Sequence, residues 1–177
     1  MPKNEDPRRQ YAENKEQIRG NLDLTVEDWI LALIAYAGGK LKGKTRIQKG
    51  LFLVWQEIGG VKADFAPYKY GPYSKDIDEA LNRLAGENLI LERVVPGGDE
   101  SPAVEYELTK RGWERARQTL NQLEESGILE RARPFLDLAI KGSLIALIGF
   151  VYSMYPEWAA NSEIKGRIRS LEKLKRL

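Results

Sequence analysis

Hydrophobic residues recur every three or four positions through most of this chain, which is the spacing of one face of an α-helix. This pattern predicts helices in residues 25–37, 45–58, 74–85, 109–123 and 143–155, a shorter one in residues 134–141, and a last one that begins at Ser162. We therefore expect a mainly helical protein.

Residues that cap helices stand before most of these segments. Thr25 precedes Asp28 by three residues, which is a variant of the capping box, and Thr45 precedes Gln48 at the same spacing. Ser74 and Thr109 are expected to cap the third and fourth helices. Pairs or single glycines follow the first three helices and predict where each one ends.

In the middle of the chain the apolar residues recur at every second position, which is the period of a β-strand. Residues 89–95 and 103–108 are typical of strands, and the turn residues 96–99 lie between them, so we expect a β-hairpin. Three helices, a hairpin and further helices predict a winged helix-turn-helix with a C-terminal helical extension. The expected parts are a polar arm in residues 1–23, the winged-helix domain in residues 24–124, and an extension in residues 125–177 that packs on the same core.

An aromatic connector with two prolines joins the second and third helices. Its tyrosines Tyr68, Tyr70 and Tyr73 are candidates for stacking on bases or for binding a partner protein. The alternative, which we favour, is that they pack the connector onto the core while each hydroxyl finds a partner.

The composition excludes several classes of chemistry. The 177 residues include neither His nor Cys, so the chain has no catalytic triad, no thiolate nucleophile and no His or Cys metal site. No carboxylate pair stands out as catalytic. We therefore expect a binding protein without enzymatic activity, without a catalytic residue, and without a metal or cofactor.

The distribution of apolar residues predicts a cytoplasmic protein with no membrane contact. The N-terminus has no signal-peptide run, and the longest apolar run, residues 144–155, is too short to cross a bilayer. The abundance of Lys, Arg and Glu is also typical of thermophiles. We expect a homodimer, and one hypothesis is that a short helix in residues 8–18 docks on the partner subunit.

The segment from Gly38 to Thr45 matches the P-loop pattern G-x-x-x-x-G-K-T. In a P-loop, Lys44 would meet the terminal phosphate of a nucleotide and Thr45 would bind magnesium. The preceding segment has a helical period, however, and the βαβ alternation of a P-loop fold is missing. The favoured interpretation is a basic turn between two helices, and nucleotide binding is the third and weakest functional hypothesis.

Three motifs resemble a mostly uncharacterised family of prokaryotic winged-helix proteins that is common in archaea. They are T-R-I-Q-K-G-L-F-L at residues 45–53, Y-K-Y-G-P-Y-S at residues 68–74, and Y-E-L-T-K-R-G at residues 106–112. A later match involves Tyr152, Tyr155 and Ser162. A weaker similarity links the first two motifs to the Panacea-type antitoxin domain. The resemblance implies the winged-helix fold and does not imply a settled activity.

Charge is unevenly distributed along the chain. Residues 38–63 have a net charge of +5 and residues 162–177 of +4, whereas residues 74–87 have −2 and residues 88–108 have −4. A winged helix usually contacts DNA with its third helix and its wing, and here both are acidic. The basic cluster at residues 40–49 is either a phosphate contact or a solvated turn, and we expect the C-terminal basic residues to form an ordinary solvated helix face.

Two functions stand ahead of nucleotide binding at residues 38–45. The first is a DNA-binding regulator, whose candidate contact residues are Lys40, Lys42, Lys44, Arg46, Lys49, Ser74, Lys75, Asn82 and Arg83. The alternative is a protein–protein interaction module, antitoxin-like or an adaptor, whose acidic wing meets a basic partner. The charge polarity fits association between proteins at least as well as it fits DNA binding.

Overall fold

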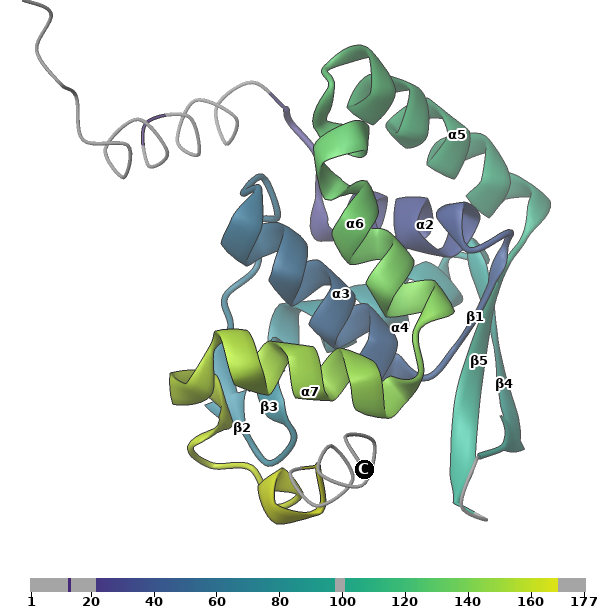
Figure 1. The fold of residues 1–177 in the computed structure, drawn as a ribbon. Coiled ribbons are helices and arrows are strands. Elements are labelled where there is room, and N and C mark those ends of the chain that lie inside the picture. Colours follow the sequence, from purple (N-terminus) through teal and green to yellow (C-terminus); the bar gives the residue numbers. More distant parts are fainter. Residues whose placement is uncertain (1–12, 14–21, 98–100, 169–177) are drawn as a thin grey trace, which may run out of the picture.

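The computed structural model describes residue 13, residues 22–97 and residues 101–168. The helices are α2 (Val26–Tyr36), α3 (Lys44–Glu57), α4 (Lys75–Gly86), α5 (Lys110–Glu125), α6 (Ile128–Lys141) and α7 (Leu144–Met154), followed by a 3₁₀ turn, η1 (Pro156–Ala159). The strands are β1 (Lys40–Lys42), β2 (Ala66–Tyr68), β3 (Gly71–Tyr73), β4 (Ile90–Pro96) and β5 (Pro102–Leu108). The fold is mainly helical with a small antiparallel sheet, as predicted (Figure 1).

The sheet joins two distant parts of the chain. Its strand order is β1-β5-β4, and both pairings are antiparallel. The hairpin β4–β5 was predicted from its alternating pattern, whereas β1 pairs with β5 through the register Lys40↔Glu107 to Lys42↔Glu105. Strands β2 and β3 form a separate two-stranded ribbon in the aromatic connector.

Helices α2 and α3 form the centre of the molecule. Helix α2 packs against α4 and α5, and α3 packs against α6 and α7 (Figure 1). Trp29 and Ile30 of α2, Leu51 of α3 and Leu136 of α6 belong to one buried cluster. The expected extension therefore shares its core with the preceding helices. Among the residues described, none of the helices combines the length and the apolar composition that a bilayer crossing requires.

Three of the predicted helices begin with a side-chain cap, and two of these caps, Thr25 and Thr109, were predicted. The hydroxyl of Thr25 accepts from the N–H of Asp28, whose carboxylate in turn accepts from the N–H of Thr25, so the capping box is complete. Thr109 accepts from the N–H of Gly112, and Ser143 caps α7. The spacing of polar residues was a reliable guide at Thr25 and Thr109 because each cap uses only local contacts.

Two predicted caps are wrong. Helix α3 begins at Lys44, after Gly43, so Thr45 lies inside the helix and caps nothing. Ser74 does occupy the position before α4, but its hydroxyl makes no capping hydrogen bond and is buried without a partner. Gln48, expected to complete the box with Thr45, bonds the backbone of Ser74 instead.

Two further segments differ from the prediction. The expected basic turn at residues 40–42 is the strand β1, which is paired along its whole length. Helix α6 begins at Ile128 rather than at Pro134, so Pro134 lies inside it. A proline inside a helix removes one N–H donor and disfavours the helix locally, and here the apolar face of α6 on the core compensates for that loss.

Some predictions fall outside the described residues. These are the helix at residues 8–18, the tip of the hairpin turn at residues 98–99, and the last helix beyond residue 168. Residues 165–168 are helical, and Ser162 accepts from the N–H of Ile164 close to the expected start.

Candidate nucleic-acid interface

Two of the motifs that carry the family resemblance, at residues 45–53 and 68–74, contribute buried residues that connect α3 to the aromatic ribbon. The side-chain amide of Gln48 donates to the carbonyl of Ser74 and accepts from its N–H, both at 2.8 Å. The ammonium group of Lys49 donates to the carbonyl of Pro72 at 2.8 Å. Lys49 and Ser74 are 3% and 0% exposed, so neither can touch DNA in this fold, and their prediction as contact residues is wrong.

Lys49 is an unusual buried lysine. Among the described residues its ammonium group has one hydrogen-bond partner, the neutral carbonyl of Pro72, and the loss of water around that group lowers the pKa of Lys49 to about 7. Burial disfavours the charged form because no carboxylate replaces the lost hydration. Lys49 therefore holds the ribbon against α3 and is a structural residue.

The aromatic ribbon is packed on one side and exposed on the other. Gly71 has φ +86°, and a Cβ atom there would lie 2.6 Å from the ring of Tyr152, so this position needs glycine. The hydroxyl of Tyr73 donates to the carboxylate of Asp78 at 2.7 Å, and this hydrogen bond raises the pKa of Tyr73 to about 12. Tyr68 and Tyr70 are about half exposed, at 50% and 49%. The favoured packing role thus fits Tyr73, while Tyr68 and Tyr70 stay available to a partner.

The charge blocks that are separate in the sequence lie side by side in the fold. Lys40 of β1 lies 3.5 Å from Glu107 of β5, and Lys44 lies 3.4 Å from Asp78 of α4. Lys42 faces Glu105 across the strands, and its ammonium group donates to the carbonyl of Pro96. The acidic wing is therefore partly neutralised within the molecule, which weakens the hypothesis that it serves as a free acidic surface.

Helix α4 has no unpaired cation on its exposed side. Lys75 lies 3.2 Å from Glu79, and Arg83 contacts Glu27 at 2.6 Å, which raises the arginine pKa. Asn82 is exposed and neutral. Of the four contact residues predicted on or before this helix, Ser74 is buried, Lys75 and Arg83 are paired with carboxylates, and Asn82 alone is both exposed and outside an ion pair.

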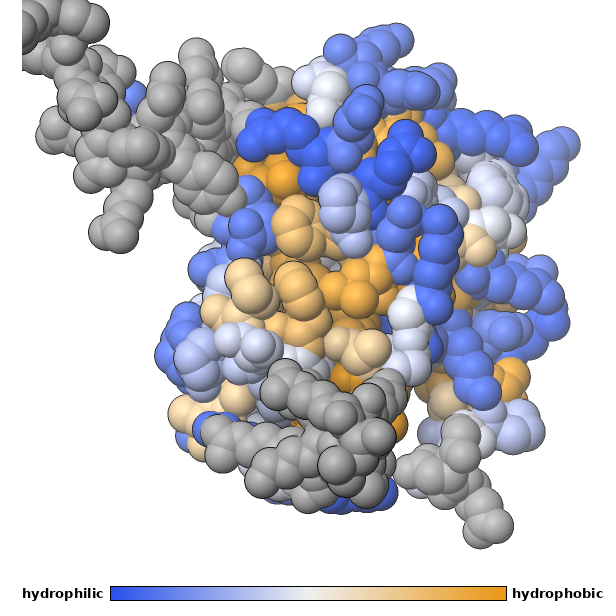
Figure 2. Space-filling model, in the orientation of Figure 1, coloured by the Kyte–Doolittle hydropathy of each residue, from blue (hydrophilic) through white to orange (hydrophobic). Residues whose placement is uncertain are grey.

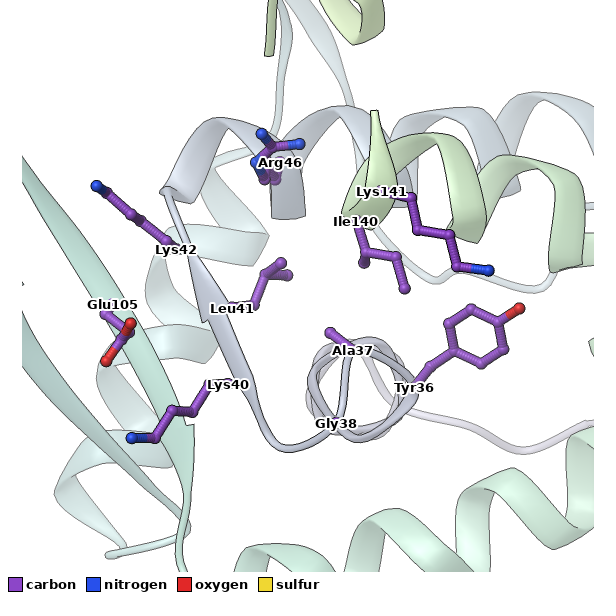
Figure 3. Close-up of a pocket in the computed structure, with 10 residues that line it drawn as sticks. All are labelled: Tyr36, Ala37, Gly38, Lys40, Leu41, Lys42, Arg46, Glu105, Ile140 and Lys141. Atoms are coloured by element: carbon purple, nitrogen blue, oxygen red, sulfur yellow. The ribbon is translucent and has the colours of Figure 1, made fainter. Parts of the chain in front are cut away.

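An open hollow of about 620 Å³ lies between β1, the end of α2 and the end of α6 (Figure 3). Ala37, Leu41 and Ile140 point toward its middle and form an apolar floor. Its remaining lining residues are Tyr36, Gly38, Lys40, Lys42, Arg46, Glu105 and Lys141. Four of these residues are basic and one is acidic, so the rim of the hollow is positively charged.

Arg46 joins the two sides of the hollow. Its guanidinium group donates to the carbonyls of Ala139 and Gly142, at 3.0 and 2.7 Å, at the end of α6. No carboxylate balances its charge among the described residues, and partial burial lowers its pKa. Arg46 thus fixes α6 against the start of α3 and adds positive charge to the hollow.

Lys141 was not predicted as a site residue. It lies at the end of α6, about a hundred residues from β1 in the sequence, and only the packing of α6 on α3 brings it to the hollow. Its ammonium group lies 3.0 Å from Asp137, which also accepts from the hydroxyl of Tyr36 at 2.8 Å. These contacts hold the pKa of Asp137 below its usual range, with the Lys141 hydrogen bond as the main cause. No local sequence signal distinguishes Lys141 from other helix-terminal lysines.

The ammonium groups flank the hollow and do not converge on one point. Lys40 and Lys42 extend from β1 on the side where Glu105 lies, away from the middle of the hollow, whereas Lys141 extends toward Tyr36 (Figure 3). A site for one isolated phosphate needs converging donors. Cations spread along two sides suit an extended polyanion, whose charges are spaced along its backbone.

The P-loop match does not have P-loop geometry. A phosphate-binding loop follows a strand and wraps around the ligand at the start of a helix. Here α2 precedes the segment, and residues 40–42 are extended and paired with β5. Lys44 points to Asp78, so the nucleotide-binding hypothesis for residues 38–45 is not supported by the fold.

A second surface is apolar. Helix α7 contains no charged residue, and Leu144, Phe150 and Met154 are exposed on it by 40%, 36% and 55%. Apolar residues gather in the middle of this face, over α6 and α7, with hydrophilic residues around them (Figure 2). Large exposed apolar side chains grouped in this way mark an interaction surface.

Comparison with models of known protein families finds no match, and comparison with curated protein sequences finds none either. Within residues 22–97 and 101–168, no three acidic side chains are grouped so that they could hold a metal ion. The candidate sites of the chain are therefore the two surfaces themselves.

Proposed function

We propose that this chain is a winged-helix protein that binds nucleic acid through phosphate contacts along β1 and the end of α6. The order α2-β1-α3-β2-β3-α4-β4-β5, with β1 paired to the hairpin β4–β5, supports the winged-helix assignment. The resemblance of residues 43–112 to the archaeal winged-helix family agrees with it. The proposal includes no catalytic step, since the chain has neither His nor Cys.

The observation that carries the proposal is the positive rim of the hollow. Lys40 and Lys42 come from β1, Arg46 from α3 and Lys141 from α6. Glu105 is the one carboxylate in the lining, and Glu107 and Asp137 lie beside Lys40 and Lys141. The ion pairs of Lys40 and Lys141 involve ammonium groups that are more than half exposed, so they contribute little and exchange easily for a phosphate. Lys42 has no carboxylate within ion-pair distance among the described residues.

The binding mode differs from the usual one for this fold. A recognition helix reads base edges in the major groove and needs neutral or basic residues there. The exposed cations of α4 are paired with Glu79 and Glu27, and the helix is acidic overall. We therefore propose contacts to the sugar–phosphate backbone that do not depend on base sequence, and α4 stays outside the groove.

A titration of fluorescently labelled duplex DNA at low ionic strength tests this function. The wild-type protein is expected to raise the anisotropy with saturation, and Lys42→Gln is expected to weaken binding several-fold. Lys62→Gln is the matched control, since Lys62 belongs to the same basic sequence block but pairs with Asp23 outside the hollow. Negligible binding by the wild type at low salt, where phosphate contacts are strongest, would rule the function out.

A protein-interaction module is the second candidate function. The half-exposed rings of Tyr68 and Tyr70 favour it, because exposed tyrosines are enriched in protein interfaces. This role would replace the first if the wild-type protein binds a specific protein partner but no nucleic acid, and if Tyr70→Ala abolishes the binding of that partner.

A further inference from the structure

The hollow between β1 and α6 places a row of cations beside an apolar floor. Lys42, Arg46 and Lys141 follow one another along one edge, and Leu41 and Ile140 lie beside them, nearer the middle (Figure 3). Arg46 comes four residues after Lys42, and its guanidinium group donates to carbonyls at the end of α6, where Lys141 lies. A ligand in the hollow therefore meets positive charge on one side and apolar side chains on the other.

Tyr36 adds an aromatic ring to this floor. It lies in the last turn of α2, its side chain is partly exposed, and Lys141 extends toward it (Figure 3). Its hydroxyl donates to Asp137 at 2.8 Å, and the ammonium group of Lys141 lies 3.0 Å from the same carboxylate. These contacts use the hydroxyl and hold the ring at the edge of the hollow. A fixed aromatic ring is the kind of platform on which nucleic-acid bases stack.

The row of cations continues along α6 beyond the hollow. Arg133, Asp137 and Lys141 are spaced by four residues and share one side of the helix, so Arg133 and Lys141 lie about 12 Å apart along its axis. Arg133 is exposed. Burial is the main cause that raises the pKa of Tyr36, and the charge of Arg133 opposes this shift, which places the guanidinium group near the ring. The cations thus extend past Tyr36 as far as Arg133.

We propose that the ligand of this interface is single-stranded nucleic acid, with its backbone along the cations from Lys42 to Arg133 and a base against Tyr36 and the apolar floor. This inference rests on the proposed nucleic-acid function and specifies the ligand class of the same site. A single strand exposes the faces of its bases beside its phosphates, which matches apolar and aromatic side chains beside a row of cations. A duplex hides those faces in the stack and offers only phosphates, sugars and base edges.

The surface beyond β1 disfavours the second backbone of a duplex. Lys40 lies 3.5 Å from Glu107 across the strands, and Lys42 is in register with Glu105. The wing that carries these two carboxylates, residues 88–108, has a net charge of −4. A second row of phosphates on this side of the hollow would meet net negative charge, so the charge distribution suits one backbone.

A comparison of single and double strands tests the inference. The anisotropy of a labelled oligothymidine of about 12 nucleotides is titrated beside that of a duplex of the same length, both at low ionic strength. The single strand is expected to bind roughly five-fold more tightly or better. An oligouridine of the same length distinguishes RNA from DNA as the source of the strand, and the inference holds if either one binds more tightly than the duplex.

The failure of this inference differs from the failure of the proposed function. Equal affinity for the two forms, or tighter binding of the duplex, would overturn the single-strand inference and leave nucleic-acid binding intact. Binding of neither form would contradict the proposed function and the inference together.

Two pairs of variants locate the strand. Arg133→Gln is expected to weaken single-strand binding several-fold, whereas Arg131→Gln, at an exposed arginine on another side of α6, is the matched control and is expected to bind as wild type does. Tyr36→Leu is expected to lose most of the preference for the single strand, and Tyr36→Phe, which keeps the ring, to retain it. Equal effects at positions 131 and 133, or an unchanged preference in Tyr36→Leu, would overturn the placement.

Photocrosslinking of the wild-type chain decides the question if Tyr36→Leu fails to fold. A single strand with 5-iodouracil in place of thymine is expected to crosslink to the peptide that contains Tyr36, identified by mass spectrometry after digestion. Tyr68 and Tyr70, the half-exposed tyrosines of the ribbon, are the competing stacking positions. Crosslinks confined to the ribbon would overturn the assignment of the hollow as the base-binding site.

Discussion

Gln48 and Ser74 are joined by a pair of 2.8 Å hydrogen bonds in which one side-chain amide satisfies both backbone groups of a single buried residue. This pair holds the start of α4 to the middle of α3 in the way that a strand pairing would. Because Ser74 is fully buried, water cannot replace the amide.

Gln48→Ala is therefore expected to destabilise the fold strongly. It leaves a buried N–H and a buried carbonyl unpaired, at a cost of about 1–3 kcal/mol each. Urea unfolding followed by tryptophan fluorescence measures the loss, and Gln118→Ala on the exposed side of α5 is the control, expected within roughly 0.5 kcal/mol of wild type. Equal stability of the two variants would show that the pair contributes nothing.

Lys49 is expected to make stability depend on pH above neutrality. Its pKa is about 7 in the fold and 10.5 ordinarily, so between these values the unfolded chain holds a proton that the folded chain has lost. Stability then rises with pH from about 7 toward 10 and is lowest where the buried amine is charged in both states.

Lys49→Met removes this dependence and keeps the volume of the side chain. The variant is expected to be more stable than wild type near pH 6, by a few kcal/mol at most, with the difference shrinking by pH 9. Denaturant unfolding at several pH values measures this, and Lys40→Met, at an exposed lysine, is expected to keep the wild-type slope. A difference that stays constant from pH 6 to 9 would contradict the titration.

Two glycines in helices are expected to respond in opposite directions to alanine. A Cβ atom on Gly112 would lie 2.0 Å from the carbonyl oxygen of Leu89, which is a backbone atom and cannot move aside, so Gly112→Ala should cost at least about 1–3 kcal/mol. A Cβ atom on Gly86 meets nothing within 4 Å, and Gly86→Ala should gain about 0.5–1 kcal/mol from helix propensity. Thermal unfolding distinguishes the two variants, and a stabilising Gly112→Ala would show that the close approach of α5 to Leu89 is misjudged.

Arg46 is expected to matter more for stability than for nucleic-acid binding. Arg46→Met removes both donors to Ala139 and Gly142 and exposes the end of α6, at an expected cost of roughly 1–3 kcal/mol. Arg46→Lys keeps the charge and should retain part of the stability. The hydrogen-exchange rates of α6 and the melting temperature measure the effect. If neither changes in Arg46→Met, the guanidinium group does not stabilise the fold, which would contradict this prediction.

The sequence predicted those parts of the fold that depend on local contacts. The spacing of apolar residues located α2, α5 and α7, and the capping residues Thr25 and Thr109 located the starts of α2 and α5. Strand β1 was missed because a three-residue strand has almost no period of its own. It exists because β5, more than sixty residues later, offers a partner.

The candidate site was only partly predictable for the same reason. Lys40, Lys42 and Arg46 were identified from charge density, but Lys141 reaches the hollow through tertiary packing alone. Lys49 and Ser74 were predicted to be exposed because lysine and serine usually are. The structure shows their buried partners: the carbonyl of Pro72 accepts from the ammonium group of Lys49, and the side-chain oxygen of Gln48 accepts from the N–H of Ser74. The net charges of segments likewise gave no sign that Lys40 and Glu107 would become neighbours.

The salt dependence of nucleic-acid affinity tests the proposed phosphate contacts most directly. Four cations flank the hollow, so the plot of log K against log salt for wild type should have a slope of about −2 to −4 on duplex DNA. Lys42→Gln/Lys141→Gln should flatten this slope by about 2, whereas the matched control Lys62→Gln/Lys110→Gln should leave it unchanged. A slope near zero for wild type, or equal flattening in both double variants, would contradict the assignment of the hollow as the nucleic-acid interface.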